Sequence, residues 1–301
     1  MEHSSLLSVC IPVYKRVEFL IKLVEKIPST YEVNISDNGG FLIQADKIKA
    51  SNIRISPSSS VLTMFENWNR AADLVTSDWF IIPGDDDIVF GDKLPQVERY
   101  IEKYPDAGII VFGHELIDGD GKVKGEWCPS EELYLSQPHG FRPFSRGVPA
   151  RWPSIVFNSK KFRETGGFDT SFKNTASDSL LMQSMSLRFP VAFIPETMGQ
   201  YRVWEDSGTS KQIMTNEWFE QIDMWIEKLG KEISANDDAS KLYDMDKIQT
   251  DIVFSNQMFA LSRMNKSGIG RAEKRSFING LSRPRKLSWI DRLRLLRALY
   301  M

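Results

Sequence analysis

Short apolar runs alternate with segments of helical spacing through the first hundred residues of this 301-residue chain. Leu6 to Val13 is a nearly continuous apolar run, and apolar residues at helical spacing follow from Val17 to Ile27. Glu32 to Ser36 is a second short run, and Trp79 to Pro83 is a later one. This alternation predicts an α/β fold, in which helices cover both faces of a mostly parallel sheet. In such sheets, ligands bind where the strands end.

The composition is that of an ordinary globular protein. The chain is 42% hydrophobic, and 38 basic residues nearly balance 40 acidic ones. The formal charge of -2 provides no global field that would attract nucleic acid, so we expect no nucleic-acid partner. Cys10 and Cys128 are too few for a disulfide framework and favour a reducing compartment. Because no apolar run is long enough to cross a bilayer, we expect a cytoplasmic protein.

Three consecutive carboxylates, Asp85, Asp86 and Asp87, follow the apolar run that ends at Pro83. Adjacent aspartates repel each other, so the cluster needs a cation or strong hydrogen-bond donors to offset its charge. Carboxylates at the end of a buried strand suit a hard divalent ion, and no His or Cys cluster favours a softer one. We therefore predict a Mg²⁺ or Mn²⁺ site. The alternative is a solvated acidic turn in which Asp85 or Asp87 caps the next helix.

Polar side chains follow two other predicted strands. Tyr14 and Arg16 come after the first strand, and Arg16 is either a phosphate contact or an exposed cation at a helix start. Asp37 follows the second strand and precedes two glycines, so its carboxylate can meet a ribose hydroxyl or a base amide. The alternative for Asp37 is a role in an Asx-turn. Arg70, on the helix before the fourth strand, is a candidate for a diphosphate contact or a salt bridge.

The second half of the sheet region is less regular. Gly108 to Gly113 is a further apolar strand, and Asp118 to Gly121 has the composition of a hairpin turn. Residues 125–150 are rich in Pro, Gly and aromatic residues without clear periodicity. A segment of this length without periodicity predicts a long functional loop. Ser177 to Leu187 is a predicted helix with Asp178 in its first turn, where the helix dipole keeps a carboxylate ionised.

The order and spacing of these features resemble the inverting glycosyltransferases of family 2, which have the GT-A fold. The resemblance covers residues 6–205 and rests on six elements of the sequence: Ser8 to Tyr14, Asp37, Asp85 to Asp87, Thr165 to Asp169, Ser177-Asp178 and Tyr201-Arg202. It implies a GT-A, Rossmann-like fold. It also implies that the chain binds a nucleotide sugar through a divalent ion, and that a later carboxylate acts as the base.

The resemblance implies a role for each candidate residue. Asp86 and Asp87 would hold the metal ion, and Asp178 would take the proton of the acceptor hydroxyl. A structural Asp at a helix start is the alternative for Asp178. The residues that would bind the nucleotide sugar lie mostly at strand ends: Pro12, Tyr14, Arg16, Asp37, Arg70, Asp85 and Arg202.

We therefore expect a metal-dependent, inverting hexosyltransferase. Its donor would be a nucleotide-diphosphate sugar, with a UDP-sugar favoured, and its acceptor a glycan or lipid-linked glycan in surface polysaccharide biosynthesis. One alternative is a nucleotidyltransferase, which would want a basic or glycine-rich loop that Pro12 to Lys15 does not provide. Another is a non-catalytic carbohydrate-binding or scaffold protein.

Three parts are expected along the chain. Residues 1–105 form the nucleotide-sugar half, residues 106–210 the acceptor and base half of the same domain, and residues 211–301 a helical region. Residues 283–301 mix cations with an apolar stripe, which is typical of a helix lying in an anionic membrane surface. This would place the protein peripherally on the inner face of the cell membrane. Docking on its own domain or on a second subunit is the alternative.

Overall fold

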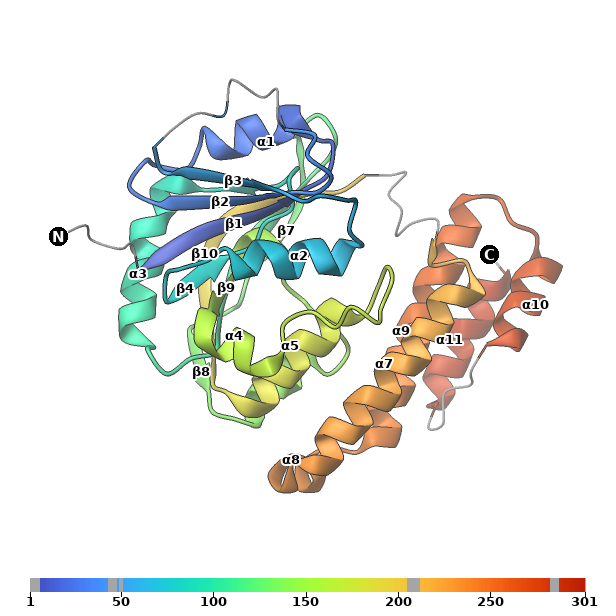
Figure 1. The fold of residues 1–301 in the computed structure, drawn as a ribbon. Helices are drawn as coiled ribbons and strands as arrows, with labels where there is room; N and C mark the ends of the chain where they lie inside the picture. Colours follow the sequence, from blue (N-terminus) through green and yellow to red (C-terminus); the bar gives the residue numbers. More distant parts are fainter. Residues whose placement is uncertain (1–5, 43–47, 49–50, 205–211, 282–286, 301) are drawn as a thin grey trace.

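The computed structural model describes residues 6–42, 48, 51–204, 212–281 and 287–300. Within these ranges a sheet flanked by helices ends at Arg202, and a helical region beginning at Asn216 lies beside it (Figure 1). This arrangement confirms the predicted α/β architecture and its C-terminal helical extension. Residue 205, at the end of the resemblance, and residues 283–286 and 301 of the predicted membrane-contacting segment lie outside the described ranges.

The described residues form a mixed sheet. Its strands are β1 (Leu7–Val13), β2 (Glu32–Asp37), β3 (Ile53–Pro57), β4 (Trp79–Ile81), β5 (Ile88–Val89), β6 (Ile109–Ile117), β7 (Val123–Trp127), β8 (Leu133–Leu135), β9 (Ile155–Asn158) and β10 (Val191–Arg202). They lie in the order β3-β2-β1-β4-β9-β6-β10-β5, with β7 beside β6 and β8 beside β10. Strands β1, β2, β3, β4, β6 and β10 share one direction, and the others run against them. The sheet is therefore mostly parallel, as predicted.

Helices follow the strands in both regions. Those of the sheet region are α1 (Val17–Val24), α2 (Met64–Asp73), α3 (Leu94–Lys103), α4 (Ser159–Thr165) and α5 (Ser177–Arg188). The helical region contains α7 (Asn216–Ala235), α8 (Asp237–Leu242), α9 (Met245–Lys266), α10 (Arg271–Gly280) and α11 (Trp289–Tyr300). Within the described ranges, no helix is both long and apolar enough to cross a membrane.

Hydrophobic cores form on both faces of the sheet. On one face, α1 and α3 contribute buried residues such as Leu23 and Ile101. On the other, α4 and α5 contribute Phe162 and Met182, and this core continues into the helical region through Trp225 of α7. Strand β1 is buried along its whole length because helices cover both faces there and β2 and β4 flank it. This burial explains its continuous apolar run.

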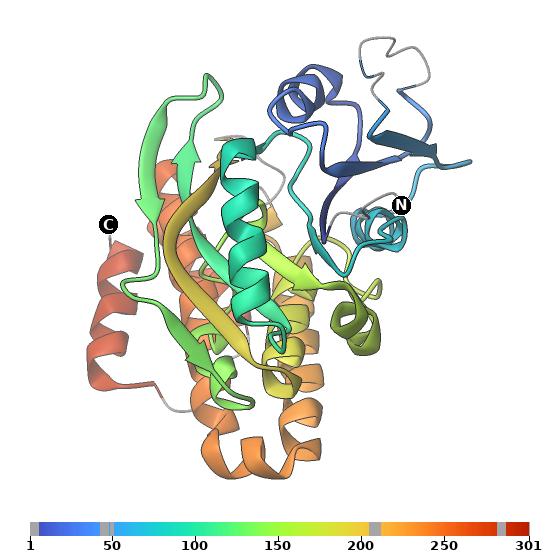
Figure 2. The same ribbon diagram turned by 90° about the vertical axis from the view of Figure 1, so that its left-hand side faces the viewer.

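The prediction of a structureless loop over residues 125–150 is wrong. This segment contains the end of β7, all of β8, and a 3₁₀ helix at His139–Phe144. Phe141 and Phe144 of that 3₁₀ helix are fully buried. Each of these elements is too short to give a readable period, which is why the pattern resembled a loop. The predicted turn at Asp118 to Gly121 does join the antiparallel strands β6 and β7 (Figure 2).

Candidate active site

The carboxyl ends of β1, β2 and β4 meet at one edge of the sheet, because β1 is parallel to both of its neighbours. Val13, the last residue of β1, is in register with Asp37, the last residue of β2. The backbone N–H of Tyr14, just beyond β1, donates to Asp85 Oδ2 at 3.1 Å. This bond ties the exit of β1 to the acidic triplet that follows β4. Three predicted site segments are therefore brought together.

All three aspartates of the triplet are buried, and Asp87 is the most deeply held. The Asp87 residue is 2% exposed. Asp87 Oδ1 accepts from the backbone N–H of Arg202 at 3.0 Å, and Oδ2 accepts from that of Gly84 at 2.9 Å. Main-chain donors thus fix both carboxylate oxygens and set the shape of the turn.

Asp85 and Asp86 share a side-chain partner, the half-exposed Arg16. Arg16 Nη1 contacts Asp85 Oδ1 at 3.4 Å and donates to Asp86 Oδ2, and the Arg16 side chain is 48% exposed. Trp204 Nε1 also donates to Asp86 Oδ2, at 2.5 Å. Burial raises the pKa of Asp85 to about 6. Burial, followed by the charge of Asp86, raises the pKa of Asp87 well above its usual range.

The triplet can be tested for its fit to a metal ion. Among the described residues, no group of three or more His, Cys, Asp and Glu side chains is arranged so that it could hold one. The charges nevertheless suit a divalent cation, because the buried carboxylates of Asp85 and Asp86 meet at the partly exposed guanidinium of Arg16. Carboxylate oxygens are also the ligands that Mg²⁺ and Mn²⁺ prefer. In this structure the positive charge beside Asp85 and Asp86 is the guanidinium of Arg16.

Asp37 has the geometry of a turn-stabilising residue. It is 1% exposed, and its two carboxylate oxygens accept from the backbone N–H groups of Phe41, at 3.0 Å, and Leu42, at 2.9 Å. Beside this turn the rings of Tyr14 and Phe41 meet edge to face at 5.7 Å, and both residues are more than two-fifths exposed. They form an accessible aromatic surface next to Asp37. Phe41 was not predicted, because it lies in a turn that has no periodic signal.

Arg70 and Pro12 lie close to this edge but bind the protein itself. Arg70 donates to Ser36 Oγ at 2.8 Å and to the carbonyl oxygens of Ser56, at 2.7 Å, and Pro57, at 2.9 Å. It therefore holds the ends of β2 and β3 together. Pro12 is buried within β1, in register with Ser36.

Arg202 also donates to carbonyl groups of the chain. Its Nε donates to the Asp86 carbonyl at 2.9 Å, and its Nη1 to the carbonyls of Asp118, at 2.7 Å, and Gly119, at 3.0 Å. Arg202 is 8% exposed and its guanidinium lies over the Phe19 ring at 4.9 Å. The positive charge of Arg202 thus lies next to the acidic turn. Its hydrogen bonds link that turn to the β6–β7 hairpin.

Asp178 lies in the first turn of α5, as predicted. Its Oδ1 accepts from the backbone N–H of Ser179 at 2.8 Å. Burial raises the pKa of Asp178 above its usual range, with this hydrogen bond and then the charge of Arg151 opposing the rise. Ala176, two residues earlier, has a φ of 71°. Lys15, beside Tyr14, has a φ of 66°, and these are the non-glycine residues with positive φ in the described chain. Such strained backbone clusters at functional sites.

The ionisation of Tyr201 is affected by Asp178 and by two aspartates of the triplet, Asp86 and Asp87. Burial raises the pKa of Tyr201 to about 12, and the charges of Asp87, Asp86 and Asp178 act in the same direction. Asp86, Asp87 and Asp178 therefore all act on the ionisation of one hydroxyl. Arg151, whose guanidinium lies 5.4 Å from the centre of that ring, opposes them. Arg151 was not predicted, and its sequence signal was a cation directly after the Pro- and aromatic-rich stretch.

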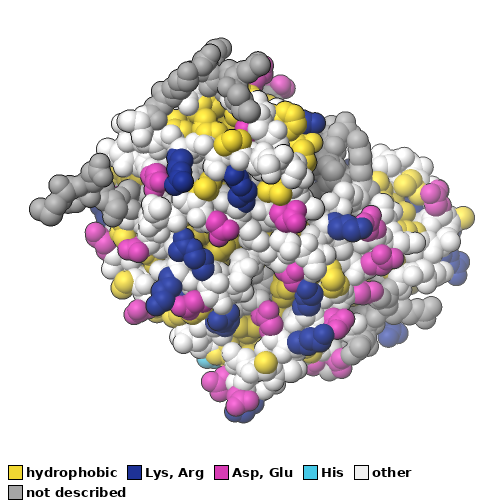
Figure 3. Space-filling view, in the orientation of Figure 1, with side chains coloured by type: hydrophobic (Ala, Val, Ile, Leu, Met, Phe, Trp, Pro, Cys, Tyr) yellow, Lys and Arg dark blue, Asp and Glu magenta, His cyan; other side chains and the backbone are white. Residues whose placement is uncertain are grey.

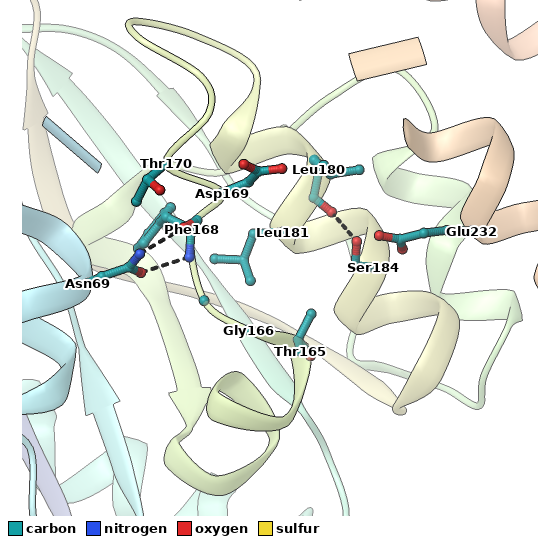
Figure 4. Close-up of a pocket in the computed structure, with 11 residues that line it drawn as sticks. Asn69, Thr165, Gly166, Phe168, Asp169, Thr170, Leu180, Leu181, Ser184 and Glu232 are labelled. Atoms are coloured by element: carbon teal, nitrogen blue, oxygen red, sulfur yellow. Dashed lines mark hydrogen bonds between the residues drawn. The ribbon is translucent and has the colours of Figure 1, made fainter. Parts of the chain in front are cut away.

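Cavities of two sizes lie near the sequence elements described above. One of about 260 Å³ adjoins the triplet and is lined by Phe19, Lys22, Glu25, Lys26, Asp86, Asp87, Ile88 and Arg202. A larger one, of about 400 Å³, lies between α2, α5 and α7 and is lined by none of the predicted site residues (Figure 4). In it Asn69 holds the backbone of Phe168 through bonds of 2.7 and 2.8 Å, and Glu232 points toward Ser184. The larger cavity is thus lined by Thr165 to Asp169, one of the sequence elements on which the family resemblance rests.

Comparisons with known proteins concern the family and the fold. The family model described as "Glycosyl transferase family 2" matches residues 8–165. No match was found among curated proteins. The crystal structure of S. aureus TarS residues 1–349 is 14% identical, with a TM-score of 0.61, covering 91% of this chain and 78% of that one. Its complex with UDP-GlcNAc gives a TM-score of 0.62 at the same identity and coverage. The match to a longer TarS structure has a TM-score of 0.55 at 13% identity, and it covers 86% of this chain and 48% of that one. Likeness at these identities concerns the fold.

Proposed function

The chain belongs to glycosyl transferase family 2, and we propose that it transfers a hexosyl group, with inversion, from a nucleotide-diphosphate sugar to an acceptor hydroxyl. The observation that carries this proposal is the buried acidic turn Asp85–Asp87, tied to the exit of β1 at the edge where β1 and β2 end, with Asp178 in the first turn of α5. A UDP-sugar is the favoured donor, since a protein of the same fold was solved with UDP-GlcNAc.

We propose Asp86 as the direct ligand of a Mn²⁺ or Mg²⁺ ion. The ion would neutralise the charge that develops on the leaving diphosphate. The partners of Asp86 are the side chains of Arg16 and Trp204, which can move aside when a cation binds. The oxygens of Asp87 are held by main-chain N–H groups, so Asp87 would mainly fix the turn from which Asp86 projects. Once displaced, Arg16 would be free to pair with the diphosphate.

Asp178 is proposed as the general base. Its carboxylate would take the proton of the acceptor hydroxyl while that oxygen bonds to the anomeric carbon of the sugar. The bond from that carbon to the diphosphate would break, and the nucleoside diphosphate would leave with its electron pair. The raised pKa of Asp178 favours this role, because a carboxylate with a higher pKa accepts a proton more readily.

The remaining parts of the site are assigned by position. The exposed rings of Tyr14 and Phe41 would stack on the nucleobase, and Asp37 would shape the turn beside it. Residues 1–105 would thus act as the donor half and residues 106–210 as the acceptor half, with residues 211–301 as a helical region.

We further propose a glycan or lipid-linked glycan acceptor, surface polysaccharide biosynthesis as the pathway, and a cytoplasmic location on the inner face of the cell membrane. Two free cysteines are compatible with that compartment.

The test combines donor binding with transfer. We expect UDP-GlcNAc to raise the melting temperature of the wild-type protein more in the presence of Mn²⁺ than in its absence, by linkage. Asp178→Asn should keep this response but lower sugar transfer by a factor on the order of 100 or more. Asp169→Asn is the matched control, because Asp169 binds Lys228 and Ser171 near the same helix.

Two outcomes would contradict the proposal. Unchanged transfer by Asp178→Asn would remove the base assignment. Absence of any response to a panel of nucleotide sugars, with or without Mn²⁺, would remove the donor assignment. Asp86→Asn should abolish the part of the thermal shift that depends on Mn²⁺, and a retained Mn²⁺ effect would show that the ion binds elsewhere.

A further inference from the structure

Helix α11 lies at the edge of the molecule (Figure 2) and carries a stripe of exposed apolar residues. Trp289, Leu293, Leu296 and Tyr300 are 71%, 55%, 49% and 60% exposed. Successive spacings of four, three and four residues put them on one face of the helix. Single exposed apolar residues are ordinary, but four on one face of one helix form a contiguous patch.

The opposite face of α11 is already occupied. Ala298 is buried, and Leu295 and Leu299 pack against the core of the helical region. Asn265 of α9 also donates to the Ala298 carbonyl at 3.3 Å. The helix is therefore docked on its own protein through one face, and this contact does not explain the outer stripe.

We propose that the outer face of α11 binds an anionic membrane surface. The first support is the position of its cations. With about 100° of rotation per residue, Arg292 and Arg297 lie about 70° to either side of the centre of the stripe. Both are exposed, as is Arg294. A helix in the plane of a membrane needs this arrangement, in which the apolar side chains enter the acyl region while flanking arginines reach the phosphate groups.

The ends of the stripe provide the second support. Trp289 begins it and Tyr300 ends it, and these two residue types are enriched where hydrocarbon meets headgroups. Arg271 of α10 lies over the Tyr300 ring at 3.4 Å and is itself exposed, so it adds a further cation at this end. The surface thus presents an apolar centre surrounded by positive charge.

A second copy of the chain fits this face less well. A twofold contact built on the stripe would bring Arg292 and Arg297 close to the same arginines of the other copy. The acidic residue of α11 is Asp291, which accepts from Ser288 Oγ and pairs with Arg294 at 3.4 Å. It lies toward the packed face rather than beside the stripe, so α11 supplies no carboxylate there to complement the arginines. An anionic bilayer supplies that complement directly.

Membrane binding would bring the enzyme to the surface that presents a lipid-linked acceptor, and this consequence rests on the proposed function. The binding itself does not. It depends on the apolar stripe and its arginines, which are separate from the Asp85–Asp87 triplet and from Asp178. The two proposals can therefore fail independently.

The test is cosedimentation of the full chain with lipid vesicles. We expect binding to vesicles of phosphatidylcholine mixed with phosphatidylglycerol, much weaker binding to phosphatidylcholine alone, and weaker binding as salt rises. Leu293→Ser combined with Leu296→Ser should lower the affinity by more than about tenfold. Arg292→Gln and Arg297→Gln should each lower it about fivefold for anionic vesicles. Leu242→Ser is the matched control, because Leu242 is 51% exposed but lies on α8.

The melting temperature of each variant, measured without ligand, is compared with that of the wild type to show that the fold is intact. Equal binding to both kinds of vesicle, or binding that the double leucine variant retains, would overturn the inference. So would self-association in light scattering that the same variant abolishes without any vesicle binding, which would identify a second copy as the occupant. If the protein binds vesicles but its melting temperature responds to no nucleotide sugar, that result would contradict the proposed function alone.

Discussion

His114 is a single buried residue whose surroundings control its ionisation. It lies on β6, is 2% exposed, and packs its ring 5.6 Å from that of Trp127. Its Nδ1 is buried without a hydrogen-bond partner. Burial, and then the charge of Arg151, lowers the pKa of His114 to about 4. The folded protein therefore favours the neutral imidazole.

This lowered pKa predicts a pH-dependent loss of stability. An unfolded His titrates near pH 6.5. The contribution of neutral His114 to the free energy of unfolding is therefore present above that pH and is lost as pH falls toward about 4. His114→Phe keeps a ring against Trp127 but cannot be protonated. Between about pH 7 and about pH 5 we expect the variant to lose less unfolding free energy than the wild type, by about 1–2 kcal/mol. Urea unfolding at both pH values measures this, and equal losses in the two proteins would contradict it.

Single residues could be located from the sequence more readily than their partners. Asp178 and the triplet were found because apolar periodicity marks where a helix begins and where a strand ends. The partners of Arg202 could not be found, because its Nε binds a carbonyl 116 positions away. Carbonyl and N–H groups occur at nearly every residue, so no sequence pattern identifies the ones that a side chain will meet.

Among the elements, the 3₁₀ turn Gly91–Lys93 depends on a close approach between distant backbones. It joins β5, which begins just after the triplet, to α3. A Cβ atom on Gly91 would lie 1.9 Å from the carbonyl oxygen of Lys26. Such a contact is impossible, so one of the two segments would have to shift. The need for glycine here could not be inferred from the sequence, because Lys26 lies in another loop.

Gly91→Ala should therefore destabilise the protein by about 1–3 kcal/mol. Because β5 follows the triplet directly, we also expect a weaker thermal response to UDP-GlcNAc with Mn²⁺. Gly280→Ala is the control, since a Cβ there meets nothing within 4 Å. Denaturant unfolding of both variants measures the difference. If the two substitutions cost the same, the close approach at Lys26 is not what requires glycine.

In the molecule as a whole, one core joins the sheet to the helical region. Trp225 Nε1 of α7 donates to Gln183 Oε1 of α5 at 2.7 Å, and Gln183 Nε2 donates to the Phe144 carbonyl at 2.8 Å. This buried chain of bonds links three elements. The sequence predicted a helix at Ser177 to Leu187 and a helical region over residues 211–301, but helical spacing does not show which helix another will meet. On the face shown in Figure 3, charged side chains of both signs are interspersed.

The shared core predicts that the two regions unfold together. Trp225→Phe leaves the buried Gln183 oxygen without its donor, which should cost about 1–3 kcal/mol. Trp218→Phe is the matched variant, because Trp218 Nε1 donates to Asn256 Oδ1 at 3.1 Å between α7 and α9, within the helical region. If unfolding is cooperative, both variants lower the hydrogen-exchange protection of β6 and β9 as well as that of α9. A loss confined to the helical region in Trp218→Phe, or two separate denaturant transitions in the wild type, would show instead that α7 to α11 unfold on their own. The shared core would then hold two independently stable units in contact.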